Sequence, residues 1–561
     1  MKSFLNILFY GAFSSMLAQQ PNLLFAKGFG GTLVDNGFSL CVDLNKNIFV
    51  AGDFNNTVDF NPGSGIANIS SLGLTDLFFA KYDALGNYVW AKSVGTSGRE
   101  TVNSIVLDKL GNLYITGFFE GTADFDPGPG VANLTKVGNG RDFYFAKYDS
   151  NGNYIWAKNL GGGNSDVGNS ITIDSVGNVH IAGSFFGVLD FDPGPGTFTL
   201  SSGVFVAEYD ANGNYMWARS LPSNGFHDAL SVKVDALGNT YVTGFYQGTM
   251  NFDFGANTYT INGGNQSIFL AKYDKLGNYK WAKSIGIAGY CEGHEICLDE
   301  NRNIYLTGTH SGTTDFDPGP STSTITPAGF GDVFFAKYDS LGNYLWAKSI
   351  GNNGWQESYT IVTDKNKSIY LSGYYTGAMD FDPSSGAATM STTASGPDIF
   401  LAKYDSIGNY VWAKSIGSNG YDFGNSLFID QTGDIYLTGN FSQTVDFDPN
   451  PTTSFLTSNS ASEDVFFAKY SSTVVGLLEE KIDSLSVYPN PANEVLMVKN
   501  LSSTTELIAK IYNTTGVLVS EQSIGSVNRT INVKTLPKSF YFLILEKNNR
   551  IIYKTKFIKE L

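Results

Sequence analysis

The sequence has few charged residues and few cysteines for its 561 positions. Charged side chains make up only 16% of it, which argues against a coiled coil and against a charge-rich disordered chain. Three cysteines cannot build a disulfide framework. Acidic residues outnumber basic ones by 52 to 36, so no nucleic-acid partner, which needs a basic face, is expected. No apolar run inside the chain reaches the roughly 18 residues of a transmembrane segment.

The first twenty residues form a separate case. Lys2 precedes an apolar stretch from Phe4 to Phe13, and small residues lead up to Ala18. This order is typical of a secretory signal peptide, so we predict one over residues 1–19, cut near Ala18. The alternative is a buried N-terminal strand.

Aromatic residues and glycine are abundant, and tryptophan recurs at a fixed period. Aromatics at 14% together with 63 glycines are typical of short strands joined by tight turns. Six of the seven tryptophans are spaced 61 to 66 residues apart, and a phenylalanine lies 65 residues before the first of them. The sequence therefore contains seven copies of one unit, marked by Phe25, Trp90, Trp156, Trp217, Trp281, Trp346 and Trp412.

Each unit contains four strand-like segments. After Trp90 they are Ser104–Asp108, Leu113–Gly117, Phe143–Asp149 and Tyr154–Lys158. The tight turns between them have the pattern Asp-x-x-Gly-Asn, in which glycine supplies a positive φ and aspartate accepts a backbone N–H. A repeated four-stranded antiparallel unit is the blade of a propeller.

The two ends of the repeats complement each other. The repeats begin with a lone fourth strand at 24–28 and end near residue 470 with three strands and no fourth. The N-terminal strand would complete the last blade and close the ring, which removes an exposed sheet edge. We predict an all-β chain with a seven-bladed β-propeller over residues 20–471.

The repeat unit resembles known propeller repeats. Its signature is the run FAKYDSLGNYLWAK, from Phe335 to Lys348. Over residues 22–471 the units resemble bacterial seven-bladed β-propeller repeats, with a strand order similar to NHL-type blades. This resemblance implies a fold and leaves the activity open.

The composition changes after the repeats, and we predict a linker at 472–484 and a second domain at 485–561. Residues 484–561 carry a net charge of +5, against −21 for the rest of the chain. This segment resembles the C-terminal sorting domain of type IX secretion systems, and the matching residues include Tyr488, Pro489, Asn490, Pro491, Gly516, Lys556 and Lys559. The family usually has glycine before the strand at this point, where this sequence has Ser539-Phe540.

The resemblance implies a small β-sandwich that the type IX secretion machinery reads as an export signal. It also implies that the exported protein is released or attached to surface lipopolysaccharide. An ordinary C-terminal β domain that binds a ligand is the alternative.

Antiparallel alternation places the short Gly-Asn turns on one face of the ring and the longer connections on the other. We call these the short-turn face and the long-loop face. Long loops on a rigid scaffold usually carry recognition, so the long-loop face is the candidate functional surface.

The second-to-third connections share an Asp-Phe-Asp motif, which the first unit alters with Asn61 and the fourth with Asn251 and Phe254. One interpretation is structural: phenylalanine anchors the loop and aspartate caps a turn. The other is a calcium site, because Ca²⁺ prefers carboxylate oxygens, although two carboxylates are few for it. The candidate calcium ligands are Asp59, Asp124, Asp126, Asp190, Asp192, Asp315, Asp317, Asp380, Asp382, Asp446 and Asp448.

Catalytic patterns are weak in this sequence, and we predict no catalytic residue. The four histidines fall in different units without metal-binding spacing, and His180 replaces a strand tyrosine, which predicts packing. The most unusual segment is Tyr290–Glu295, where Glu292 and His294 break the repeat. Cys41 and Cys297 occupy one strand position and are expected in the core.

Three functions remain open. The first is an exported module that binds an extracellular protein or glycan. The second is a secreted polysaccharide-active propeller enzyme, and the third is a purely structural surface component.

Overall fold

The computed structural model describes residues 20–253, 258–286, 289–394, 396–450, 452–471, 485–499, 507–513, 518–525, 528–547 and 550–560. The predicted signal peptide at 1–19, the predicted linker at 472–484 and Gly516 lie outside the described residues. The chain divides into two compact units, Met1–Ser472 and Thr473–Leu561.

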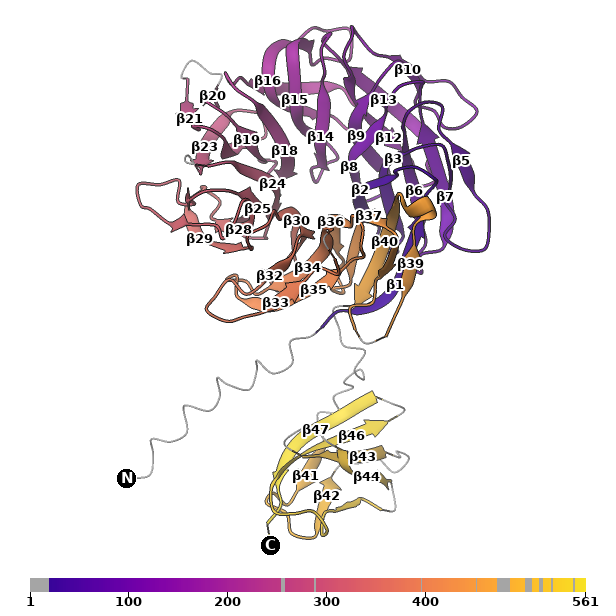
Figure 1. Ribbon diagram of the computed structural model, residues 1–561, viewed down its shortest axis with the longest axis vertical. Helices are drawn as coiled ribbons and strands as arrows, with labels where there is room; N and C mark the ends of the chain where they lie inside the picture. The colour runs from indigo at the N-terminus through magenta and orange to yellow at the C-terminus, as the bar shows by residue number, and fades with distance from the viewer. Residues whose placement is uncertain are drawn as a thin grey trace. The chain divides into compact units, whose positions relative to one another are not determined.

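The described part of the first unit contains seven four-stranded antiparallel sheets arranged in a ring (Figure 1). The first strands surround the centre and are β2 (Asn36–Val42), β8 (Thr101–Leu107), β14 (Val167–Ile173), β18 (His227–Val234), β24 (Cys291–Leu298), β30 (Glu357–Thr363) and β36 (Phe423–Ile429). The second strands are β3 (Ile48–Phe54), β9 (Leu113–Phe119), β15 (Val179–Asp190), β19 (Thr240–Tyr246), β25 (Ile304–His310), β31 (Ile369–Tyr375) and β37 (Ile435–Ser442). The third strands are β6 (Asp76–Tyr82), β12 (Asp142–Tyr148), β16 (Thr199–Tyr209), β22 (Ser267–Tyr273), β28 (Asp332–Tyr338), β34 (Asp398–Tyr404) and β40 (Glu463–Ser471). The outermost strands are β7 (Tyr88–Val94), β13 (Tyr154–Leu160), β17 (Tyr215–Leu221), β23 (Tyr279–Ile285), β29 (Tyr344–Ile350), β35 (Tyr410–Ile416) and β1 (Asn22–Phe29).

Neighbouring sheets stack face to face because their middle strands are apolar on both faces. In β12, Phe143 and Phe145 belong to a core shared with the following sheet. Tyr144, Ala146 and Tyr148 of the same strand belong to a core shared with the preceding sheet. Successive side chains of a strand point to opposite faces, so one strand supplies two cores.

A hydrogen bond between neighbouring first strands repeats around the ring. Ser39 Oγ accepts from the N–H of Ile105 in the next sheet at 3.1 Å. Ser426 Oγ of the last sheet accepts from the N–H of Leu40 in the first sheet at 3.2 Å. The same position supplies the acceptor in the other five sheets, as Ser104, Ser170, Ser231, Glu295 and Thr360. These bonds form a closed cycle that joins the last sheet to the first.

β1 connects the beginning of the ring to its last sheet. It pairs antiparallel with β40, with Ala26 opposite Ala468. At its end, the Phe29 ring lies 5.2 Å from the ring of Phe60 and 5.6 Å from that of Phe78, centroid to centroid. The predicted all-β propeller fold is confirmed, and so is the completion of the last sheet by the N-terminal strand.

The second-to-third connections contain structure that the sequence pattern does not reveal. In the second sheet, β10 (Thr122–Asp124) and β11 (Asn133–Thr135) form a short hairpin outside the main sheet. In the third sheet, β15 and β16 are instead lengthened and remain paired as far as Asp190 and Thr199. These hairpins hold the Asp-Phe-Asp segments in place.

The second unit is built from two antiparallel sheets. One contains β41 (Ser486–Tyr488), β42 (Val495–Lys499) and β45 (Thr530–Asn532). The other contains β44 (Leu518–Ile524), β43 (Leu507–Tyr512), β46 (Phe540–Lys547) and β47 (Arg550–Ile558). Residues of both sheets, among them Leu496 and Leu543, share one buried core. In neither unit does the described chain contain a helix long and apolar enough to cross a membrane.

Candidate binding site

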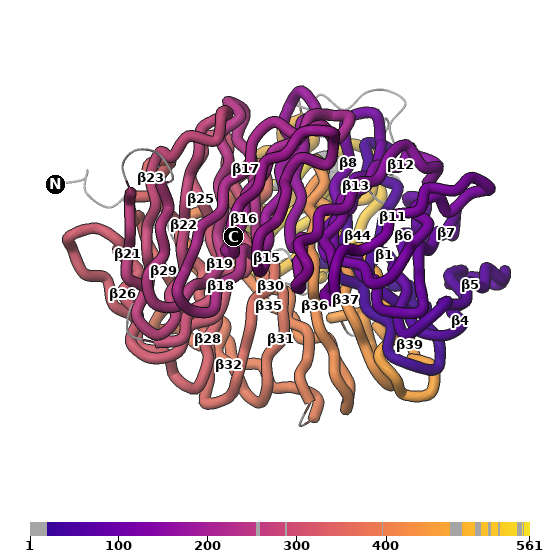
Figure 2. Tube along the Cα trace, turned by 90° about the horizontal axis from the view of Figure 1, so that it is seen from above, coloured from indigo at the N-terminus to yellow at the C-terminus, as the bar shows by residue number. Residues whose placement is uncertain are grey.

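The long-loop face of the ring carries a central cavity built by a repeated irregularity of the first strands. Seen from the side, the strands run between two faces that carry the connections (Figure 2). Near the beginning of each first strand the pairing with the second strand slips by one residue, in β2 between Gly37 and Ser39. Such a bulge re-aims the side chain of the extra residue. The seven bulged residues line one cavity of about 650 Å³, and they are Phe38, Asn103, Asn169, Leu230, His294, Tyr359 and Asn425.

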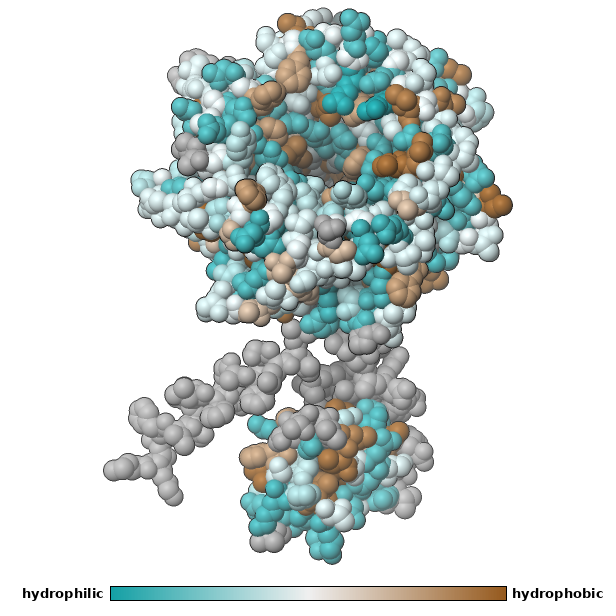
Figure 3. Space-filling model, in the orientation of Figure 1, coloured by the Kyte–Doolittle hydropathy of each residue, from teal (hydrophilic) through white to brown (hydrophobic). Residues whose placement is uncertain are grey.

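The bulged position varies from sheet to sheet, whereas the next residue supplies the repeated hydrogen bond between sheets. The varied position offers aromatic, aliphatic, amide and imidazole side chains to the cavity. Sequence reasoning missed this site. The available signal was a position that differs among the seven repeats and is followed by one that is nearly constant. Figure 3 shows one face of the ring with a hollow at its centre.

The charged part of the cavity comes from three glutamates and His294. His294 Nε2 lies 3.2 Å from Glu292 Oε2, and its Nδ1 lies 3.0 Å from the carbonyl oxygen of Ser358. Although burial opposes it, the hydrogen bond to Glu292 raises the pKa of His294. Glu357 accepts a hydrogen bond from Trp355 Nε1 at 2.6 Å. The unusual segment at Tyr290–Glu295 therefore reaches the central cavity.

Four consecutive sheets also expose one aromatic side chain each just before the first strand. They are Phe226, Tyr290, Trp355 and Tyr421, whose exposed fractions are 74%, 57%, 44% and 60%. We call this set the aromatic arc. Isolated exposed apolar residues are ordinary, but tyrosine and tryptophan repeated on one face are typical of an interaction surface.

The Asp-Phe-Asp segments have a structural role in the hydrogen-bond pattern. Asp124 Oδ1 accepts from the N–H groups of Asp126 at 3.0 Å and Ala132 at 2.7 Å, which closes the loop. Asp126 Oδ1 accepts from the N–H of Gly128 at 2.8 Å. The intervening Phe125 is fully buried. The first oxygen accepts the same pair of bonds at Asp59, Asp190, Asp315, Asp380 and Asp446.

The fourth sheet shows what this position requires. Asn251 replaces the first aspartate, and its Oδ1 accepts from the N–H groups of Asp253 and Tyr259, each at 3.2 Å. One neutral oxygen therefore suffices to close the loop. For the calcium hypothesis to hold, these carboxylates would have to bind the ion in addition to closing the loop. Calcium binding stays a prediction.

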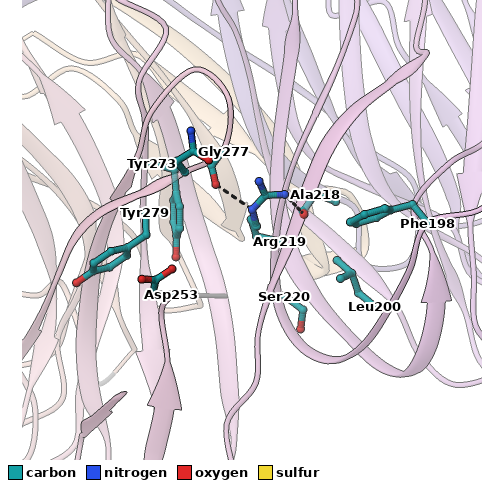
Figure 4. Close-up of a pocket in the computed structure, with 10 residues that line it drawn as sticks. Phe198, Leu200, Ala218, Arg219, Ser220, Asp253, Tyr273, Gly277 and Tyr279 are labelled. Carbon is teal, nitrogen blue, oxygen red and sulfur yellow. Dashed lines mark hydrogen bonds between the residues drawn. The ribbon is translucent and has the colours of Figure 1, made fainter. Parts of the chain in front are cut away.

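The pair Asp124 and Asp126 faces a groove between neighbouring sheets. A groove of about 410 Å³ is lined by Lys92 of β7 together with Asp124 and Asp126 of the next sheet. The equivalent groove of about 440 Å³ between the third and fourth sheets carries Arg219 and Asp253 (Figure 4). There, Arg219 Nε donates to the carbonyl oxygen of Gly277 at 2.9 Å, which ties β17 to a turn of the next sheet.

The predicted sorting residues come together in the second unit, although they lie far apart in the sequence. Asn490 Nδ2 donates to the carbonyl oxygen of Lys556 at 3.0 Å, and Asn490 Oδ1 accepts from the N–H of Ile558 at 2.9 Å. The N–H of Lys559 donates to the carbonyl oxygen of Ser539 at 2.9 Å. The Tyr-Pro-Asn-Pro segment, Tyr488 to Pro491, is thus held against the last strand.

Comparison with known proteins agrees with these two parts. Residues 486–560 match the family described as the secretion system C-terminal sorting domain, and residues 155–184 match the β-propeller repeat family. An uncharacterized WD repeat-containing protein of Acanthamoeba polyphaga mimivirus is 26% identical over 545 residues, covering 81% of this chain and 39% of that protein. The chain thus spans about two fifths of the length of that curated relative.

Solved structures show a weaker likeness. The WD40 domain of Pan2 from Neurospora crassa has a TM-score of 0.37 at 8% identity, covering 80% of this chain and 97% of that one. The extracellular domain of a putative hybrid two-component system from B. thetaiotaomicron has a TM-score of 0.16 at 11% identity, covering 95% and 98%.

By its sheet topology and its repeats, the protein is a β-propeller. It carries a C-terminal type IX secretion sorting domain, which directs it to the outer-membrane surface or the medium.

Proposed function

We propose that this protein is an exported binding module whose ligand, an extracellular protein or glycan, docks on the long-loop face. The central cavity, whose seven bulged side chains are of five different types, is the observation that carries the proposal. A repeated scaffold needs no variety at one position for stability alone, whereas recognition of an asymmetric ligand does. In this proposal residues 1–19 are a signal peptide, and the sorting domain leads to release or to attachment on surface lipopolysaccharide.

The chemistry of the face favours neutral or basic ligand groups. Glu292, Glu357 and Glu463 make the cavity acidic. The residues of the aromatic arc directly precede the first strands that line the cavity, and they lie on the same face. Carboxylates attract cationic side chains, and tyrosine and tryptophan supply large rigid contact area with a polar edge. An acidic polymer would be repelled unless a cation bridged it.

The test is binding of the purified full chain to cell surfaces and to an array of extracellular glycans and proteins. Tyr290→Ala combined with Trp355→Ala should weaken saturable binding at least tenfold, the effect of removing interface aromatics. Leu44→Ala combined with Leu110→Ala is the matched control, because these residues are 81% and 82% exposed on the short-turn face. Equal loss in both variants, or no binding to any member of the array, would contradict the proposal.

A polysaccharide-active enzyme is the second candidate, and the Glu292–His294 pair beside Glu357 favours it. Acid–base cleavage of a glycosidic bond needs two positioned carboxyl groups, which this wall contains. Turnover of a glycan, abolished by Glu292→Gln while binding persists, would support the enzyme. Binding without turnover would support the module.

A further inference from the structure

A cation repeats in six of the seven sheets, close to the short-turn face. In each of these sheets a lysine of the third strand places its ammonium group 4.6 to 4.9 Å from the centre of an aromatic ring on the second strand. The pairs are Lys81–Phe49, Lys147–Tyr114, Lys272–Tyr241, Lys337–Tyr305, Lys403–Tyr370 and Lys469–Tyr436. In three of these sheets the lysine also lies within 4 Å of the aspartate that begins the adjoining turn, with Lys147 Nζ 3.8 Å from Asp108, Lys337 Nζ 3.9 Å from Asp299 and Lys403 Nζ 3.7 Å from Asp364. These three sites combine an aromatic ring, an ammonium group and a carboxylate.

The third sheet departs from this arrangement at both partners. His180 stands where the other sheets have the aromatic ring, and Glu208 stands where they have the lysine. The turn aspartate is retained as Asp174. The exchange removes a positive charge and adds a carboxylate. One ligand atom from each of the three side chains lies within 4.8 Å of the others.

The surroundings of His180 prepare one ring nitrogen for a ligand. The side chain is fully buried, and its Nδ1 lies 3.0 Å from the hydroxyl of Thr240 in the next sheet. Six sheets begin the second strand with isoleucine, leucine or valine, so Thr240 is also a departure. Nδ1 also lies 3.9 Å from Glu208 Oε2, so it is the ring nitrogen that faces this carboxylate. Among the described residues, His180 Nε2 has no hydrogen-bond partner.

Glu208 is held in place by neutral donors. Its Oε2 accepts from Trp217 Nε1 at 2.6 Å, and its Oε1 accepts from Asn178 Nδ2 at 2.9 Å. Within the described part of the chain, neither Glu208 nor Asp174 forms an ion pair with a lysine or an arginine. A buried carboxylate without a paired cation lowers the stability of the fold unless another positive charge is supplied.

We propose that Asp174, His180 and Glu208 bind a divalent transition-metal ion of the zinc class. Imidazole nitrogen and carboxylate oxygen are ligands that Zn²⁺ accepts, and three protein ligands leave one tetrahedral position for water. The ion takes the electrostatic place of the ammonium group found in the six other sheets. Hydrogen bonds from Trp217 and Asn178 orient the Glu208 carboxylate. The proposal does not depend on the ligand of the long-loop face.

The experiment is titration of the chelator-treated full chain with Co²⁺ and Zn²⁺. One equivalent of Co²⁺ should give the visible absorption bands of a tetrahedral site, and Zn²⁺ should displace it and raise the melting temperature. The double variant His180→Tyr with Glu208→Lys rebuilds the pair of the other six sheets, so it should fold and lose both responses. Glu208→Gln, which keeps the shape, should weaken binding at least tenfold.

A matched control addresses other metal sites. His294→Asn removes the histidine of the central cavity and should leave the Co²⁺ spectrum unchanged. The proposal is overturned if the wild-type chain binds neither ion stoichiometrically, or if the double variant keeps the spectrum. A melting temperature that responds to Ca²⁺ and not to Zn²⁺ would also overturn it.

Discussion

The two faces of the ring use aspartate in opposite ways. On the short-turn face, Asp149 Oδ1 accepts from the N–H groups of Asn151 at 2.8 Å and Asn153 at 2.9 Å, and other turns repeat this pattern. On the long-loop face, carboxylates are buried where neighbouring sheets meet, as at Asp76 and Glu100. The turns of the short-turn face are nearly uniform because they share the task of reversing the chain. The long-loop face differs from sheet to sheet, and recognition can be built there.

Because of this difference, the pKa values of the carboxylates are shifted in opposite directions on the two faces. Although burial opposes it, hydrogen bonds from Asn153 and Asn151 hold the pKa of Asp149 below its usual value. On the other face, burial raises the pKa of Asp76 to about 6 and that of Glu100 to about 7. The four predictions that follow test the comparison, and they are ordered by the size of the expected effect.

The largest effect is expected at the seam of the ring. Phe29 is 4% exposed and packs against aromatic rings of the first sheet. Phe29→Ala should therefore lower the free energy of unfolding by about 3–5 kcal/mol, measured by urea denaturation. Leu24→Ala on the same strand is the control, since Leu24 is 46% exposed, and it should change stability by less than about 1 kcal/mol. Similar losses in both variants would mean that the seam does not depend on this packing.

The sequence predicted this seam because the numbers of strands at the two ends are complementary. The alternation along one strand could not predict the central cavity, because a β-bulge depends on the pairing of two strands, and only the variation of the bulged position among the repeats could have indicated it. Phe38 and Ser39 are adjacent in β2, yet only Phe38 lines the cavity, while Ser39 bonds to the next sheet. The cluster at His180 was equally hidden, because its partner Glu208 lies on another strand.

The second effect is a dependence of stability on pH that arises on the long-loop face. Burial raises the pKa of Asp76 and Glu100 above the unfolded values of about 4, so their contribution is present at low pH and lost as pH rises through about 6 to 7. The free energy of unfolding in EDTA should fall by about 1–3 kcal/mol between pH 5 and pH 8.5. Asp76→Asn keeps the acceptor for the N–H of Leu72 and should make the slope shallower.

Asp149→Asn on the short-turn face provides the contrast for this measurement. The pKa of Asp149 is lowered, so its contribution is present above its unfolded pKa and lost only as the pH falls through its folded value. This substitution should leave the slope between pH 5 and pH 8.5 unchanged. A wild-type slope of the opposite sign would show that the buried carboxylates are ionised and bound to a partner cation.

The third effect separates the two interpretations of the Asp-Phe-Asp loops. Asp124→Ala removes the acceptor of two N–H groups and should cost about 1–3 kcal/mol. Asp124→Asn should cost much less, because Asn251 already closes the equivalent loop of the fourth sheet. The measurement is the melting temperature in EDTA and in millimolar Ca²⁺. A shift of many degrees with Ca²⁺, lost in Asp124→Asn with Asp126→Asn, would make these pairs calcium sites, whereas no shift would leave them as loop closures.

The smallest effect concerns two adjacent residues that serve different purposes. Ser39→Ala removes one hydrogen bond between the first and second sheets and should cost about 0.5–1.5 kcal/mol while leaving ligand binding unchanged. Phe38→Ala should do the reverse, since Phe38 is half-buried at the cavity wall and takes no part in the regular pairing of β2. Urea denaturation and the binding assay on the same two variants check both halves. If Phe38→Ala lost as much stability as Ser39→Ala and kept full binding, the bulged residues would be packing elements, and the separation of framework from recognition along a single strand would fail.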